Sequence, residues 1–153
     1  MKQRLAVAAL ILIATAATAQ HWPDYWQSNA HEVWRSFTIA DVEAIIRSGG
    51  EVNEADRFGW TPLMYVCRYN ADPDVVRALT AAGARVGITE GIVPFRTVLM
   101  IAAEHTIDAA VLHALLNAGA DPAATDLNGN TALDYAQENA ALSDSEVLDS
   151  LSS

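Results

Sequence analysis

Four histidines and one cysteine are the side chains in this sequence that most often bind metals or act as nucleophiles. No two of the histidines stand four residues apart on a helix beside a third ligand, as helical zinc sites require; they are His21, His31, His105 and His113. Cys67 is the single cysteine, so it forms no disulfide within the chain, and no neighbouring base is apparent to activate its thiol. We predict no metal site and no cysteine nucleophile, with Cys67 as a buried hydrophobic residue.

The carboxylates of the sequence do not form a recognisable catalytic set. With 19 aspartates and glutamates, pairs at short spacing arise by chance and carry no signal for paired-acid catalysis. Glu104, His105 and Asp108 are close in sequence, but neighbouring residues of a helix point to different faces. A glycine-rich phosphate loop and a Gly-x-Ser-x-Gly elbow are both absent from the sequence. We predict that the protein is not an enzyme and uses no cofactor.

The stretch DRFGWTPLMYVCRYN (Asp56–Asn70) indicates a different chemistry, that of a protein-binding surface. It contains aromatic and basic side chains that a regular helix does not require: Arg57, Phe58, Trp60, Arg68 and Tyr69. Trp, Tyr and Arg are the residues most enriched among interface anchors, each of which can contribute about 2 kcal/mol or more to binding. Such anchors are effective only where rigid elements present them together.

An internal repeat predicts those elements. A Thr-x-Leu signature begins at Thr61, Thr97 and Thr131, with spacings of 36 and 34 residues. A glycine expected at helix ends recurs at Gly49, Gly83 and Gly119, with spacings of 34 and 36 residues. Two markers with matching periods predict stacked helix-turn-helix units.

Each unit is predicted to begin its first helix at the threonine. Thr61 can cap that helix with its hydroxyl, and Pro62 fits the first helical position, where a missing N–H costs nothing. A second helix with apolar spacing follows, as in Val75–Leu79, and the glycine ends it. In the last unit, Ser143 and Glu146 have the spacing of a capping box.

These segments resemble the ankyrin repeat family. DRFGWTPLMYVC (Asp56–Cys67) and DLNGNTALDYAQ (Asp126–Gln137) are similar to the family unit D-x-x-G-x-T-P-L-H-x-A-A, which is followed by a second helix ending L-L-x-x-G-A. The resemblance implies an all-α ankyrin-repeat solenoid of about four helix-turn-helix units joined by hairpin-like loops, with atypical terminal caps. It covers residues 28–151, and we expect units at approximately 28–52, 53–86, 87–122 and 123–151.

The sequence departs from the family pattern in two places. Met64, Met100 and Asp134 replace the histidine that follows Thr-Pro-Leu, which removes part of the family's polar brace. The loop Gly87–Thr97 is about two residues too long, lacks the expected Asp and Gly, and is rich in apolar residues.

The resemblance also implies where a partner binds: on a concave groove formed by the hairpin tips and the first helices. We expect the contact residues to be Arg57, Phe58, Trp60, Arg68, Tyr69, Phe95, Arg96 and His105. Further variable positions of this groove are Val93, Pro94, Glu104, Leu127, Asn128, Asn130, Glu138 and Asn139. The arginines are expected to form a positive strip suited to an acidic segment of the partner. The alternative is that Phe58 and Trp60 only pack on neighbouring hairpins.

The beginning of the chain has the pattern of a secretion signal. Residues 1–19 combine Lys2 and Arg4, an apolar run and a small-x-small motif at Ala17–Ala19, which predicts cleavage after Ala19. We therefore expect a periplasmic or secreted protein with no membrane association after cleavage. Residues 20–27 contain the aromatic side chains of Trp22, Tyr25 and Trp26, which either cover the exposed end of the repeats or bind a partner.

The net charge narrows the partner classes. The whole chain has a net charge of −10, and removal of Lys2 and Arg4 with the signal leaves −12. Such a chain repels nucleic acids and anionic membranes, so we expect neither as a partner. The function predicted is a non-catalytic protein-interaction module in the periplasm. Two narrower roles remain open: an immunity or inhibitor protein against a toxin or enzyme, and an accessory factor for a periplasmic enzyme such as one of oxidative-stress defence.

Overall fold

The chain folds into helices that stack in pairs. The computed structural model describes residues 30–47, 49–56, 58–70, 72–91, 95–142 and 146–152. The pairs are α3 (Ala30–Arg35) with α4 (Ile39–Arg47), α5 (Pro62–Tyr69) with α6 (Pro73–Ala81), α7 (Val98–His105) with α8 (Ala109–Asn117), and α9 (Ala132–Glu138) with α10 (Val147–Leu151). None of the described helices is long and apolar enough to cross a membrane. The predicted signal peptide, the aromatic segment 20–27, Arg57 and Ser143 lie outside the described residues.

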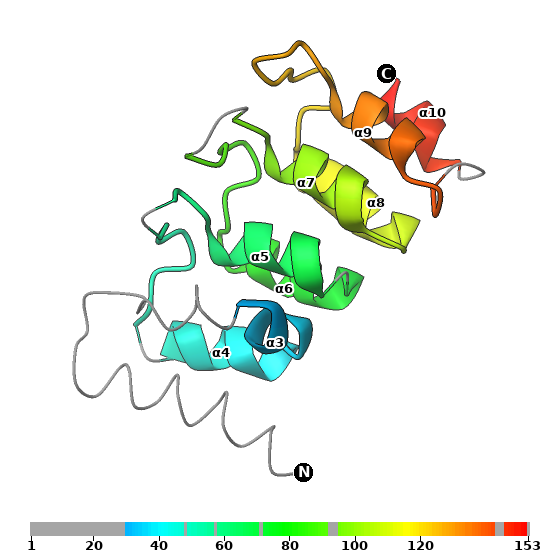
Figure 1. Cartoon of the computed structure of the whole chain (residues 1–153). Coiled ribbons are helices and arrows are strands. Elements are labelled where there is room, and N and C mark those ends of the chain that lie inside the picture. The colour runs from blue at the N-terminus through cyan, green and yellow to red at the C-terminus, as the bar shows by residue number, and fades with distance from the viewer. Residues whose placement is uncertain are drawn as a thin grey trace.

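The helix pairs form two layers. The first helices α3, α5, α7 and α9 pack on one another in that order, and the second helices α4, α6, α8 and α10 do the same. Figure 1 shows the loops that precede α5, α7 and α9 projecting to the same side of the stack. We call these loops the second finger (residues 53–61), the third finger (87–97) and the fourth finger (123–131). The described residues form no strand, only an isolated bridge between Thr89 and Thr97, and the predicted all-α solenoid is confirmed.

Two of the three predicted threonine caps are present. The Thr131 hydroxyl accepts a hydrogen bond from the Asp134 backbone N–H at 3.4 Å, and the Asp134 carboxylate accepts one from the Thr131 backbone N–H at 2.7 Å. This reciprocal pair is a capping box, so Asp134 supplies a local brace at the position where the family has histidine. Thr97 caps α7 through the backbone N–H of Met100 at 3.3 Å.

The predicted hydroxyl cap at Thr61 is wrong. Thr61 has the extended backbone of an N-cap residue, but its buried hydroxyl makes no hydrogen bond within the described residues. Pro62 occupies the first helical turn, where its fixed φ angle already matches the helix. The start of α5 therefore depends on the proline ring rather than on the threonine hydroxyl.

The recurring glycines adopt the conformation that the repeat requires. Gly49, Gly83 and Gly119 have φ angles of 75°, 94° and 90°. At Gly83 and Gly119 the following residue donates its backbone N–H to a carbonyl in the last turn of the preceding helix, which ends the helix as predicted.

The core runs between the two layers. Among its largest fully buried side chains are Leu63, Leu99 and Leu112, and Trp34 and Phe37 extend it into the first helix pair. Cys67 is fully buried, and burial raises the pKa of its thiol far above the ordinary value. Cys67 is therefore a packed small side chain that stays protonated.

Asparagine braces tie neighbouring first helices together. The Asn139 side-chain amide donates to the backbone carbonyls of Ala103 and Thr106 at 2.9 and 2.8 Å. Asn70 makes the same two bonds two units earlier in the stack, to Trp34 and Phe37. Asn139 was predicted to be a variable position open to a partner; this is wrong, because its amide satisfies two carbonyls of the adjacent unit.

Candidate protein-binding surface

Asp56 fixes the shape of the second finger. One carboxylate oxygen accepts the backbone N–H groups of Phe58 and Trp60 at 2.8 and 2.9 Å, and the other accepts the Tyr65 hydroxyl at 2.6 Å. The fourth finger repeats this arrangement with Asp126 and Tyr135, whose hydroxyl lies 2.7 Å from the carboxylate. Burial and this hydrogen bond raise the pKa of Tyr135 to about 12. Trp60 is thus carried by a finger that is tied to its own helix.

Arg68 lies against two aromatic rings. Its guanidinium carbon is 5.7 Å from the centre of the Trp60 ring and 5.3 Å from the centre of the Tyr69 ring. Both distances fall within the range of cation–π attraction. Trp60 is half-buried and packs on Tyr65, with the ring centres 5.1 Å apart. Trp60 therefore packs on the helix of its own unit rather than on a neighbouring hairpin, and the same ring also positions Arg68.

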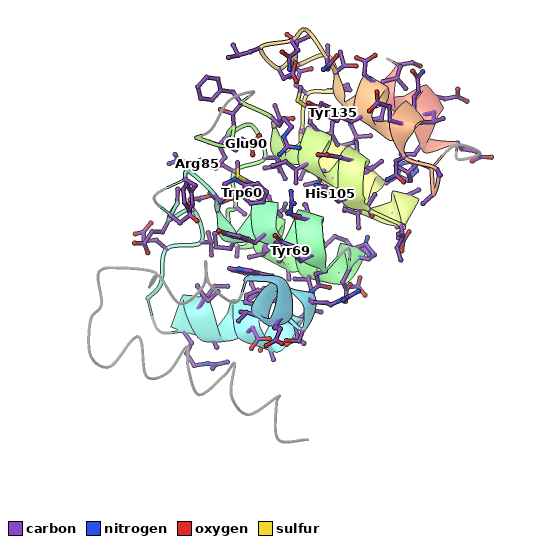
Figure 2. All side chains as sticks on the ribbon, viewed as in Figure 1. Trp60, Tyr69, Arg85, Glu90, His105 and Tyr135 are labelled. Carbon is purple, nitrogen blue, oxygen red and sulfur yellow. The ribbon has the colours of Figure 1, made fainter. Side chains whose placement is uncertain are left out.

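A chain of polar contacts links this cluster to the next unit. Arg68 Nη1 is 3.0 Å from His105 Nε2, and His105 Nε2 is 3.3 Å from the Glu104 carboxylate. Glu104 also pairs with Arg96 of the third finger. Figure 2 shows the labelled side chains of Trp60, Tyr69, Glu90 and His105 around helices α5 and α7, in the middle of the stack. The structure thus joins the predicted residues of α5, α7 and two fingers into one surface.

We call this surface the finger–helix surface. It comprises Phe58, Trp60, Arg68, Tyr69, Phe95, Arg96, Glu104 and His105.

Glu90 is an important residue that the sequence reasoning missed. Its side chain is only 4% exposed and accepts hydrogen bonds from Arg96 Nε at 2.7 Å and Nη2 at 3.3 Å. This hydrogen bond is the largest cause of the raised pKa of the Arg96 guanidinium. Glu90 and Arg96 both belong to the third finger, and Arg96 joins this finger to α7 through Glu104. A signal was present, since Glu90 is the one acidic residue in the sequence of this finger, which also contains Arg96.

The Glu90 contact also corrects the predicted positive strip. Arg96 is paired with two carboxylates, Glu90 and Glu104, so its charge is compensated within the protein. Arg68 has no carboxylate partner within the described residues. Of the two arginines of the predicted strip that the structure describes, only Arg68 is not compensated by a carboxylate; the third, Arg57, lies outside the described residues.

The tips of the second and third fingers expose aromatic rings. Phe58 is 42% and Phe95 is 39% exposed, and Phe95 has a φ angle of 62°. A bulky residue in this left-handed region is rare and strained, and such strain is typical of functional positions. The two fingers are joined by a hydrogen bond of 2.9 Å from the Gly91 N–H to the Phe58 carbonyl.

The expected positions of the fourth unit take no part in this cluster. Leu127 is 64% exposed at the tip of its finger, while Asn128 and Asn130 donate to Asp126 from within the loop. Val93 and Pro94 lie outside the described residues. Across the residues that the structure describes, no group of three or more potential metal ligands comes together.

A comparison with protein families identifies the fold. A model of ankyrin repeats, described as three copies, matches residues 35–126. The chain belongs to the ankyrin repeat family. Ankyrin repeats are in general protein–protein interaction modules and are typically non-catalytic. The chain is also similar to the platypus (Ornithorhynchus anatinus) "Ankyrin repeat, SAM and basic leucine zipper domain-containing protein 1", with 39% identity over 71 residues. That match covers 44% of this ankyrin-repeat chain but only 14% of the relative's length.

Proposed function

We propose that this ankyrin-repeat chain is a non-catalytic binding module that works in the periplasm and holds a partner protein against the finger–helix surface. The observation that carries the proposal is the position of Arg68 against both Trp60 and Tyr69. Anchors that are already ordered lose little conformational entropy on binding, so a few of them suffice for affinity.

The exposed finger tips support the same surface. Phe58 and Phe95 add apolar area beside the arginine cluster, and an apolar centre with polar surroundings is the usual composition of an interface. Phe95 combines a left-handed backbone conformation with a residue that is 39% exposed, and strain of this kind is typical of functional positions.

The compartment is proposed from the sequence. The basic start, apolar run and small-x-small motif of residues 1–19 favour export through the general secretion route. The partner is then a periplasmic protein. A module that inhibits its partner lowers the partner's activity on binding, whereas an accessory factor leaves that activity unchanged or raises it.

Affinity capture from periplasmic extract tests the proposal. We expect the wild-type chain to retain a defined partner, and the Trp60→Ala/Phe95→Gly variant to weaken its binding by about 2 kcal/mol or more, roughly 30-fold. Glycine at position 95 removes the ring and also relieves the left-handed strain, so this change does not unfold the third finger.

A matched control removes apolar area from elsewhere on the protein. Ile46 of α4 is 52% exposed and lies on a second helix, outside the finger–helix surface. Ile46→Ala should retain the partner like wild type. Equal capture by all three proteins, with unchanged thermal unfolding, would show that the partner binds elsewhere.

A further inference from the structure

Arg68 is chemically distinct from its neighbour Arg96. The chain has 19 acidic and nine basic residues, so most cations are expected to find a carboxylate nearby. Arg96 follows this expectation and pairs with Glu90 and Glu104. Arg68 instead has His105 as its polar partner, and no carboxylate of the described residues pairs with it. A half-buried guanidinium without a counter-charge is an unsatisfied electrostatic feature of this surface.

An aromatic stack holds Arg68 in position. Tyr69 stacks on Tyr65 with ring centres 6.4 Å apart, and Tyr65 stacks on the buried Trp34 at 5.1 Å with the planes nearly parallel. Trp60 packs on the same Tyr65 ring from the second finger. The guanidinium therefore rests on rings that are anchored in the core, and its orientation is fixed before any partner arrives.

The geometry of the guanidinium points to its ligand. A guanidinium has five N–H donors in a planar fork, and Arg68 uses only Nη1, toward His105 Nε2 at 3.0 Å. The Nε and Nη2 donors have no hydrogen-bond acceptor among the described residues, and two parallel donors match the two oxygens of a carboxylate. We propose that Arg68 binds a carboxylate of the partner protein, through the edge of its guanidinium that His105 leaves unused.

This inference rests on the proposed function and names the chemistry of the partner. The ligand is an Asp or Glu side chain, or the carboxyl terminus, presented among apolar residues that contact Trp60 and the finger tips. A polyphosphate such as a nucleic acid is a poor alternative, because the net charge of −10 repels a polyanion at long range. A single carboxylate on a neutral segment experiences mainly the local charge of Arg68.

His105 adds a pH dependence to the site. Its Nε2 accepts from Arg68 only in the neutral form that carries its proton on Nδ1, whereas the Glu104 carboxylate, 3.3 Å from the same nitrogen, pairs with the protonated ring. Burial is the main cause that lowers the pKa of His105; Glu104 opposes this shift, and Arg68 and Arg96 add to it. Among the described residues, the polar contact to His105 from the helices packed on α7 comes from Arg68 of α5; α8 carries the titratable group His113, and α9 carries Asp134, Tyr135 and Glu138.

Acidification therefore changes the charge beside Arg68. A protonated His105 can no longer accept from Arg68 and becomes a second cation at the site. A bound carboxylate favours this protonated form, so partner binding should strengthen as the pH falls. An Asp or Glu carboxylate of the partner is still ionised at about pH 5.5, well above its ordinary pKa of about 4.

A random peptide library displayed on phage tests the inference with a defined probe. We expect peptides selected on the wild-type chain, and weakened by Trp60→Ala, to share an acidic residue. Changing that residue to its amide should weaken binding to wild type by roughly tenfold or more, the loss typical of a charge-assisted pair. When the peptide binds the Arg68→Gln variant, changing its acidic residue to the amide should have little effect on affinity, because the Arg68 guanidinium that pairs with the carboxylate is absent.

Three further proteins sharpen the comparison. Arg77 of α6 is paired with Asp74 and lies in the layer of second helices, outside the finger–helix surface. The Arg77→Gln variant should therefore bind the peptide like wild type. Arg68→Lys keeps the charge but loses the planar fork, and should bind less tightly than wild type. From about pH 7.5 to about pH 5.5 the wild-type affinity should rise, and His105→Ala should abolish that rise.

The possible outcomes separate this inference from the proposed function. Peptides that lack an acidic residue, or that bind Arg68→Gln as tightly as wild type, would overturn the carboxylate site while leaving the binding surface intact if Trp60→Ala still weakens them. Selected peptides that are indifferent to Trp60→Ala would overturn the proposed surface, and the carboxylate site with it.

Discussion

Gly59→Ala is expected to destabilise the domain by about 2–5 kcal/mol, because the change combines backbone strain with a backbone collision. Gly59 has a φ angle of 78°, where a side chain costs about 1–2 kcal/mol. A Cβ atom at this position would also lie 2.4 Å from the Gly91 nitrogen and 2.6 Å from its Cα atom. The third finger must then move, which breaks the hydrogen bond between the Gly91 N–H and the Phe58 carbonyl.

The fourth finger provides the matched control for this change. Gly129 occupies the same position relative to its threonine and has a φ angle of 84°, but a Cβ atom added there would meet no other atom within 4 Å. Gly129→Ala should therefore cost only the strain of about 1–2 kcal/mol. Urea unfolding of the three proteins measures both free energies. Equal losses for the two variants would show that the second and third fingers are not in contact at Gly59 and Gly91.

Glu90→Gln is expected to cost about 3 kcal/mol, the lower end of the range for breaking a buried ion pair, because Glu104 still neutralises Arg96. Glu90 is 4% and Arg96 is 15% exposed in their side chains, so the lost charge is poorly replaced by water. Because both residues belong to the third finger, loss of this pair should also loosen the finger itself, while Arg96 still pairs with Glu104 of α7. Urea unfolding gives the free energy, and fluorescence of a dye attached to the finger reports the loosening.

An exposed ion pair on α4 provides the control for the stability effect of Glu90→Gln. Glu43 and Arg47 of α4 are 3.8 Å apart and 62% and 72% exposed. Glu43→Gln should change the stability by less than about 0.5 kcal/mol, as is usual for surface pairs. If Glu90→Gln is as mild as Glu43→Gln, then the ion pair does not hold the third finger.

The repeat period made the architecture predictable. Local rules determine the recurring features, since a glycine in the left-handed conformation ends a helix and a threonine or proline begins one. Gly83 and Gly119 end α6 and α8 as those rules require, and Thr97 and Thr131 cap α7 and α9. Thr61 is the exception, because Pro62 beside it starts the helix without a hydroxyl bond.

Contacts between units were less predictable because they join residues far apart in the chain. The Asn139 amide bonds to carbonyls 33 and 36 residues earlier, and nothing in its local sequence indicates this. Its counterpart Asn70 stands at the corresponding position two repeats earlier. This recurrence of asparagine could have predicted the contact between units. The Asp56–Tyr65 and Asp126–Tyr135 braces recur in the same way.

The candidate site was predicted as a set of residues but not as a network. Three of the predicted contact residues, Trp60, Arg68 and His105, contact one another directly or through Arg68. The sequence could not show that Arg96 is compensated, because its partner Glu90 lies in a finger with no regular counterpart in the other units. Within the described part of the finger–helix surface, only the folded finger shows that Arg96 is paired with carboxylates and Arg68 is not.

Photo-cross-linking from the third finger tests the central claim, that a partner protein binds the finger–helix surface, most directly. Phe95 is replaced by the photoreactive amino acid p-benzoylphenylalanine, and the protein is irradiated in periplasmic extract; Ile46 of α4, which is also exposed, is replaced in the same way as the control. We predict a covalent product with one defined protein from position 95, lost when Trp60→Ala is added, and no such product from position 46. A product formed equally from both positions, or from position 46 alone, would contradict the account.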